Sequence, residues 1–381
     1  MRKTVWIILS CFLTLLFVPK TYGQAQDKLL SLLKEELAQQ MKELKGEEFP
    51  PYHMNYRVID VTTSVVSTSF GALMNSQQYR SRTLVPQIRL GDATLDNFKF
   101  AQMGAQQPSS ARLPLDEDNN EDAIRQAIWN ETNNRYKFAV DMYQRTKAQT
   151  TVNVEEEDKA PYFSEVPVEK YYEAPLPVEK TKIDLDEWAK RLKEISAVFK
   201  NQPGIMQGDA MMIYTVERRY FVNSEGTEVV QNLPYARIMV FGETKADDGM
   251  ELPLNLSYFA YDPKDLPSND KIIADAKEMV KTLKALRVAP MVDPYTGPAL
   301  LSGPASGVFF HEIFGHRVEG QRMKSESDGQ TFKKMVGEYV LPADMHVYDD
   351  PTIREYAGED LNGFYKYDDQ GVKAERVDVV V

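Results

Sequence analysis

The sequence predicts an α+β protein with three successive parts. A mixed N-terminal α/β part comes first, an antiparallel β meander with flanking helices follows, and a β-rich part ends the chain. Two observations indicate this order. Apolar residues recur at helical spacing in some segments and alternate as in strands in others, with glycine-containing turns between them. The chain has 381 residues, 43% of them hydrophobic, which suffices for a sizeable core in two or three domains.

Residues 1–23 have the order of a secretory signal peptide. The charges of Arg2 and Lys3 precede an apolar run over residues 5–18, and the small residue Gly23 follows before a polar stretch. The apolar run is short for a membrane-spanning helix. A lipid-bearing Cys11 and an uncleaved anchor are the alternatives. We expect an exported bacterial protein, periplasmic or extracellular, that does not bind a membrane after cleavage.

Residues 24–150 are expected to form an N-terminal α+β domain. Residues 27–45 place four leucines and a methionine on one helical stripe. Residues 52–100 then change to strand patterns, with a turn at Gly71. The strand candidates here lie at residues 57–61, 64–67 and 84–90. Residues 116–149 return to a helical pattern, with acidic residues in the first turns, where the helix dipole favours them.

Residues 151–183 are acidic and rich in proline, which predicts an extended connector. Residues 184–288 follow as a central region of helix and meander. It opens with a helix at residues 185–200 and closes with one at residues 269–288. The strand candidates between these helices lie at residues 210–222, 227–231, 235–242 and 250–261. Turn signals between the candidates favour an antiparallel meander.

The charge and the cysteine count exclude several classes of function. The net charge is −12 at pH 7, which argues against a nucleic-acid partner. One cysteine excludes a disulfide framework or a cysteine-rich zinc finger within this chain. That cysteine, Cys11, lies in the predicted signal peptide, so the chain that remains after cleavage has none.

The residues able to carry chemistry gather at residues 311–316, which read His-Glu-Ile-Phe-Gly-His. Zinc favours neutral imidazole ligands, and a neighbouring carboxylate can take a proton from water. The histidines are spaced i, i+5, about 140° apart on a regular α-helix, so they cannot reach one metal from it. The helix must end or widen between them, and a distortion costs least at Gly315. From spacing alone, a metal site and two core histidines both stay open.

This segment resembles the signature of the TldD/PmbA family of metallopeptidases, also called the modulator of DNA gyrase family. The catalytic member of that family carries the same His-Glu-x-x-x-His, followed by Leu/Val-Glu-Gly, which here is Val318-Glu319-Gly320. The resemblance is strong over residues 291–376 and diffuse before them. The other similar segments are residues 221–226, 298–307, 347–352 and 367–371.

The resemblance implies a site and a function. His311 and His316 would be ligands of Zn²⁺, and Glu312 would be the general base for hydrolysis of an amide by metal-activated water. Residues 289–381 would be the start of an incomplete, β-rich metallopeptidase catalytic domain. Members of the family work as dimers around a cavity that admits unfolded peptides. We therefore expect an unfolded peptide or protein substrate, and a homodimer or a heterodimer with a family member.

Two departures from the family pattern change these expectations. Family enzymes take a third zinc ligand, a cysteine, from a later region that this chain lacks, so we expect a fragment or a truncated relative. Glu319, Asp349 and Asp350 are candidate oxygen donors in its place, and the spacing selects none of them. The second departure is the signal peptide, since familiar members are cytoplasmic. The alternative function is an inactive family member that acts as a scaffold for a partner subunit or binds peptides.

The two remaining histidines have simpler interpretations. His53 follows two prolines at the edge of the first strand block, and we expect it to be structural or exposed. His346 lies in a predicted strand, and we do not expect it to be a metal ligand.

Overall fold

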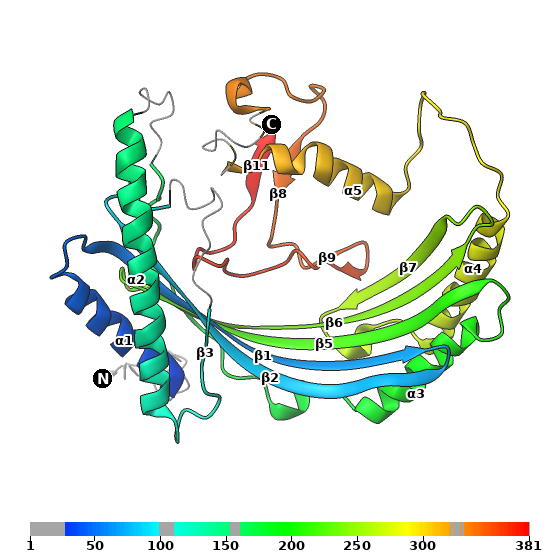
Figure 1. Ribbon diagram of the computed structural model, residues 1–381, viewed down its shortest axis with the longest axis horizontal. Helices are drawn as coiled ribbons and strands as arrows, with labels where there is room; N and C mark the ends of the chain where they lie inside the picture. Colours follow the sequence, from blue (N-terminus) through cyan, green and yellow to red (C-terminus); the bar gives the residue numbers. More distant parts are fainter. Residues whose placement is uncertain are drawn as a thin grey trace, which may run out of the picture.

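The computed structural model describes residues 27–98, 110–152, 161–320, 322, 329 and 331–380. The predicted signal peptide lies outside this part of the chain. Among the helices in these ranges, none combines the length and the apolar character needed to cross a membrane. The fold is α+β, as predicted: a large, open, curved sheet carries helices on one face and the C-terminal segment on the other (Figure 1).

One sheet contains both predicted strand blocks. The strand order is β3-β2-β1-β5-β6-β4, and β7 also pairs with β6. β1 pairs antiparallel with β5 along most of its length, from Asn55 opposite Asn223 to Ser69 opposite Asp209, and this pairing joins the first block to the meander. The strands are β1 (Pro51–Ser69), β2 (Ala72–Leu90), β3 (Ala111–Arg112), β4 (Lys170–Tyr172), β5 (Ile205–Asn223), β6 (Glu228–Lys245) and β7 (Glu251–Ala260).

The antiparallel meander is confirmed, but its strands are longer and fewer than predicted. The candidates at 57–61 and 64–67 form one strand, β1, and those at 227–231 and 235–242 form β6. Pro234 lies between the second pair of candidates, and a proline cannot donate a ladder hydrogen bond. In β6 it lies between the residues that pair with β4 and those that pair with β7, while its other side pairs with β5 opposite Val216. The proline therefore occupies a local edge, where a donor is not needed.

Two further sequence predictions need correction. The helix expected from residue 116 begins at Glu121, because the Asp116 carboxylate accepts hydrogen bonds from the N–H groups of Asp118 (3.1 Å) and Asn119 (3.2 Å) and forms a turn first. The described part of the proline-rich connector, residues 161–183, contains β4, which pairs parallel to β6, and the 3₁₀ turn η2 (Val178–Lys180). The domain boundaries derived from the sequence stay predictions.

Helices cover one face of the sheet in two groups. Even-numbered residues of β1, β5 and β6 point to this face, as strand alternation requires. One core lies against α1 and α2, and the other against α3 and α4, at opposite ends of the sheet (Figure 1). The helices are α1 (Lys28–Leu44), α2 (Glu121–Val152), α3 (Leu185–Ser196) and α4 (Asn269–Arg287).

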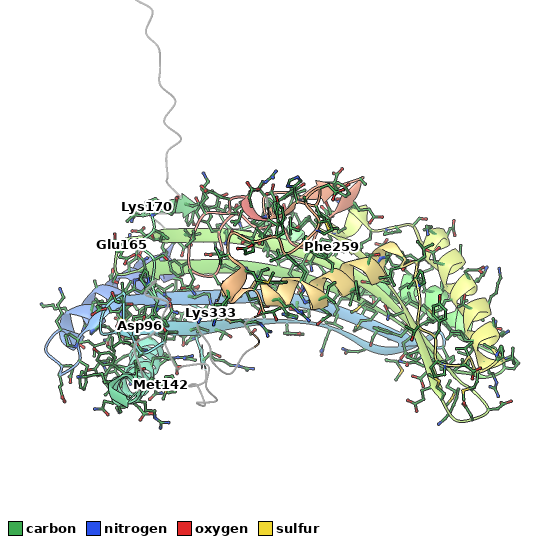
Figure 2. All side chains as sticks on the ribbon, turned by 90° about the horizontal axis from the view of Figure 1, so that it is seen from above. Asp96, Met142, Glu165, Lys170, Phe259 and Lys333 are labelled. Atoms are coloured by element: carbon green, nitrogen blue, oxygen red, sulfur yellow. The ribbon has the colours of Figure 1, made fainter. Side chains whose placement is uncertain are left out.

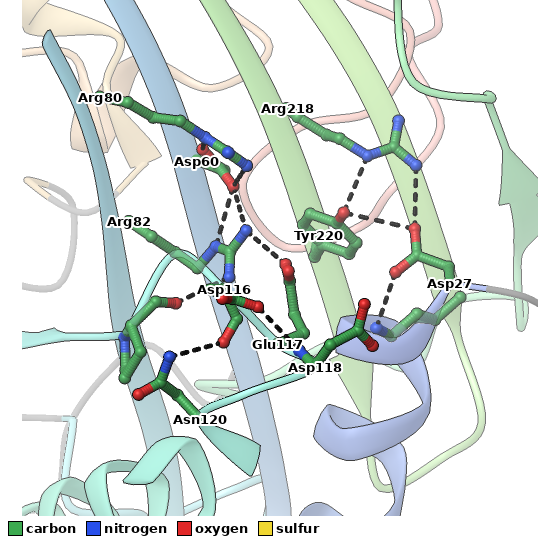
Figure 3. A network of polar contacts seen from close by, with 12 residues as sticks. Asp27, Asp60, Arg80, Arg82, Asp116, Glu117, Asp118, Asn120, Arg218 and Tyr220 are labelled. Carbon is green, nitrogen blue, oxygen red and sulfur yellow. Dashed lines mark hydrogen bonds and ion pairs between the residues drawn. The ribbon is translucent and has the colours of Figure 1, made fainter.

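A network of charged side chains lies on the same face, near the first of these cores (Figure 3). Asp60 of β1 is 4% exposed and accepts hydrogen bonds from Arg82 (2.5 and 2.8 Å) and from Arg80 (both 2.7 Å). Arg82 also pairs with Glu117 (2.6 Å). Asp27, the N-cap of α1, accepts a hydrogen bond from Arg218 of β5 (3.0 Å). Asp60, Arg80, Arg82, Glu117, Asp27 and Arg218 thus each have a partner of opposite charge.

The opposite face of the sheet carries the C-terminal segment. Tyr367 packs on Phe221 and Val229, and the side chain of Gln231 donates a hydrogen bond to its carbonyl (2.9 Å). Gly371 lies so close that a Cβ would meet the Phe221 ring at 2.4 Å, and its φ of +72° also requires glycine. The segment also contains α5 (Gly303–Ile313), the 3₁₀ turn η5 (Gly315–Arg317), β8 (Val347–Asp349), β9 (Glu355–Tyr356), β10 (Glu359–Asp360) and β11 (Val377–Val380).

Candidate metal centre

Helix α5 ends between the two histidines of the motif. Its last residue is Ile313, and Phe314 leaves the helical conformation with φ −121° and ψ −54°. The 3₁₀ turn η5 begins directly afterwards at Gly315. His311 thus lies in the last turn of the α-helix and His316 in a tighter turn. The predicted break is confirmed, and it lies one residue before the expected glycine.

Phe314 fixes this break by packing. It is 3% exposed, whereas α5 itself contains no buried residue. Its ring stacks on Phe310 at 5.0 Å between centroids and contacts Phe332 at 5.8 Å. Because the Phe314 side chain is the buried one, the imidazoles of His311 and His316 stay accessible. Figure 2, seen from above, shows α5 lying over the sheet.

The break brings the three motif side chains together. One ligand atom from each of His311, Glu312 and His316 lies within 4.8 Å of the others. The imidazole rings are 4.5 Å apart between centroids. Glu312 has one carboxylate oxygen 4.0 Å from Nε2 of His311 and the other 3.8 Å from Nε2 of His316. These separations exceed hydrogen-bond distance, so the three side chains lie close together without being hydrogen-bonded to one another.

His316 is held from its other side by Glu319. Its Nδ1 lies 2.7 Å from Oε1 of Glu319, and the second oxygen of that carboxylate accepts a hydrogen bond from Nε of Arg322 at 2.6 Å. Both contacts favour the charged form, so the Arg322 and then the His316 hydrogen bond lower the pKa of the Glu319 carboxyl. Glu319 is thereby engaged on both oxygens.

The other candidate residues lie elsewhere. Asp349 and Asp350 are not part of the group, and Asp350 accepts hydrogen bonds from Thr352 instead. His346 precedes β8 rather than lying in a strand, and it is exposed. We expected His53 to be either structural or exposed, and it is structural. It is 2% exposed, and its Nδ1 lies 3.2 Å from Oε1 of Glu225.

The contacts that join Glu319 and Arg322 to His316 were not predicted from the sequence. Both follow His316 at intervals of three residues, and this spacing puts side chains on one side of a helical turn. A carboxylate three residues after a candidate ligand histidine was therefore the available signal.

The residues present fit a divalent transition metal. Two closely spaced imidazoles are ligands that zinc takes in catalytic sites, and the Glu312 carboxylate lies beside them, where a general base is needed. The side chains of His311 and Glu312 are 62% and 61% exposed, so an incoming molecule can reach the group.

Comparison with known proteins agrees with this centre. Residues 294–381 match the family model described as the PmbA/TldA metallopeptidase C-terminal domain. A metalloprotease of Archaeoglobus fulgidus is 31% identical over 111 residues, which are 29% of this chain and 24% of the relative. The matched stretch thus spans about a quarter of the length of that relative.

Solved structures share the fold. TldE from Thermococcus kodakarensis matches with a TM-score of 0.55 and 16% identity, over 92% of this chain and 67% of its own. A protein named as a candidate modulator of DNA gyrase from Bacteroides thetaiotaomicron matches with a TM-score of 0.56 and 12% identity, over 93% and 70%. At these identities the likeness concerns the fold alone.

The motif, its geometry and the matched C-terminal domain agree with one another. Residues 294–381 therefore belong with the C-terminal domain of the PmbA/TldA metallopeptidases.

Proposed function

We propose that this chain carries the metal-binding motif of a zinc-dependent peptidase that cleaves unfolded peptides or proteins. The observation that carries the proposal is the clustering of His311, Glu312 and His316 where α5 ends. His311 and His316 hold the zinc, and Glu312 acts as the general base. The remaining protein ligand comes from outside the described residues, since catalytic zinc usually takes three.

The geometry suits hydrolysis of an amide. His311 and His316 would hold the zinc, which would supply a Lewis acid that polarises a carbonyl and lowers the pKa of water. Glu312 lies within 4.0 Å of both imidazoles, so its carboxylate is placed to take a proton from the attacking water. The same carboxyl then returns the proton to the leaving amine. His316 stays oriented through its contact with Glu319.

The proposal extends to the location of the protein, its substrate and its assembly. The signal-like residues 1–23 support export to the periplasm or the cell exterior. The resemblance to the family supports an unfolded peptide or protein as the substrate. Family resemblance supports a homodimer or a heterodimer with another member. The net charge of −12 disfavours nucleic acid as a partner.

The test is the Glu312→Gln variant of the full-length protein, compared with wild type on an unfolded protein substrate. We expect wild type to hold about one zinc per subunit and the variant to keep its zinc. Cleavage by the variant should fall by about 10²- to 10⁴-fold, because the general base is lost. Glu278→Gln, an exposed glutamate on α4, is the matched control and should cleave as wild type does.

Two outcomes would contradict the proposal. Cleavage by the Glu312→Gln variant at the wild-type rate would remove Glu312 from the mechanism. Absence of zinc from the purified full-length protein would favour the inactive alternative, a scaffold for a partner subunit or a peptide-binding protein.

A further inference from the structure

Glu319 occupies the side of His316 that faces away from Glu312. Its Oε1 lies 2.7 Å from Nδ1 of His316, while Nε2 of the same ring lies 3.8 Å from Glu312. The two nitrogens of this imidazole therefore face two carboxylates with different contacts. Only the Glu319 contact is within hydrogen-bond distance.

The backbone after α5 creates this arrangement. The N–H of Val318 donates to the carbonyl of Gly315 (3.3 Å), and that of Arg322 donates to Glu319 (3.1 Å), so consecutive tight turns follow the helix. In such turns, residues three apart lie on one side. His316 and Glu319 are three apart, as are Glu319 and Arg322, which places the three side chains in a row.

The contact selects one tautomer of His316. An ionised carboxylate only accepts hydrogen bonds, so Nδ1 of His316 carries the proton toward Glu319. In a neutral imidazole the other nitrogen, Nε2, then presents its lone pair, and it faces the space beside Glu312. The Glu319 carboxylate therefore determines which ring nitrogen of His316 carries the proton.

We propose that Glu319 is a positioning residue for the metal centre: it fixes the tautomer and ring orientation of His316, and Arg322 anchors Glu319 in turn. This inference rests on the proposed function, because it assigns to His316 a metal to bind. It also excludes Glu319 as the missing ligand, since its oxygens contact His316 (2.7 Å) and Arg322 (2.6 Å). Ligand histidines commonly donate their second nitrogen to such a carboxylate.

The two histidines differ in their contacts with carboxylates. The nearest carboxylate to Nε2 of His311 is Glu312 at 4.0 Å, and the described residues give His311 no counterpart of the Glu319 contact. Loss of Glu319 should therefore disturb His316 and leave His311 in place.

The first experiment measures zinc affinity, by chelator competition, of the full-length protein and its Glu319→Gln variant. We expect the variant to bind zinc about 10- to 100-fold more weakly. Glu338→Gln changes an exposed glutamate outside the group and serves as the matched control. Equal affinities of wild type and Glu319→Gln would overturn the inference while leaving the proposed function intact. If wild type itself binds no zinc, the proposed function fails.

The second experiment needs no metal. Nitrogen NMR of ¹⁵N-histidine-labelled, metal-free protein reports which ring nitrogen carries the proton, and a His316→Gln spectrum assigns the signal. We expect His316 to be protonated at Nδ1 in wild type and to lose this preference in Glu319→Ala. An unchanged tautomer in Glu319→Ala would overturn the inference, whatever the zinc measurement gives. A role in stability alone would not change the tautomer.

Discussion

Two groups of charged side chains in this molecule contain similar residue types but differ in burial and in hydrogen bonding. The network around Asp60 and Arg82 is buried, at 4% and 1% side-chain exposure, and all of its contacts are short. The group of His311, Glu312 and His316 is open, and its facing nitrogens and oxygens stand 3.8 to 4.0 Å apart. Both combine carboxylates with nitrogen groups, but only the second leaves ligand atoms uncommitted.

The difference shows how a structural polar group differs from a functional one. Charges removed from water must be fully paired, because an unpaired buried charge costs several kcal/mol. A site that takes a metal must instead keep donor atoms apart until the ion arrives. Hydrogen-bond satisfaction, and not the number of charged residues, separates the two regions.

The largest effect on folding is expected from Arg82→Met. This change leaves Asp60 buried with less compensation, and it should lower the free energy of unfolding by about 3 kcal/mol or more, measured by urea denaturation. Zinc affinity should stay at the wild-type value. Arg80→Met is the matched control: Arg80 contacts the same carboxylate but is 47% exposed, and its loss should cost about 1 kcal/mol or less. Equal costs for the two variants would break the comparison.

A smaller effect is expected from His53, which is buried beside the carboxylate of Glu225. Burial lowers the pKa of His53, against the opposing effect of Glu225 and with a smaller lowering by Arg89. Below pH 6.5 the unfolded chain therefore binds a proton that the folded protein does not. Stability should be complete above that pH and fall below it, by at most about 1.4 kcal/mol per pH unit.

The measurement is urea denaturation at pH 7.5 and 5.5. We expect His53→Gln to remove this part of the pH dependence, and His346→Gln, which changes an exposed histidine, to retain it. If the His53→Gln variant keeps the whole pH dependence of the unfolding free energy, His53 is not the source of that dependence.

The smallest effect is expected from Glu312→Gln in the metal-free protein. Because Glu312 is 61% exposed and outside hydrogen-bond distance of both imidazoles, its loss should change the unfolding free energy by no more than about 0.5 kcal/mol. Thermal unfolding in the presence of a chelator measures this. A loss of 2 kcal/mol or more would place Glu312 with the structural network instead.

The sequence predicted the features that depend on local pattern. The apolar stripes of α1, α3 and α4 and the glycine turn at Gly71 needed only periodicity and turn chemistry. The motif likewise predicted the break between His311 and His316, since its spacing is incompatible with a continuous helix.

Features that depend on distant pairing were not predictable. The join of β1 to β5 brings together residues at least 140 positions apart, and nothing local specifies it. The continuity of β6 through Pro234 depends on which strands lie beside that residue. The contact between Glu319 and His316 arises from a 3₁₀ turn whose exact course follows from the burial of Phe314.

The measurement that tests the metal centre most directly is anomalous diffraction at the zinc edge from crystals of the full-length protein grown with zinc. We predict a peak between Nε2 of His311 and Nε2 of His316, lost in His311→Ala. A zinc peak elsewhere with none at this place, or a peak that persists unchanged in His311→Ala, would contradict the assignment.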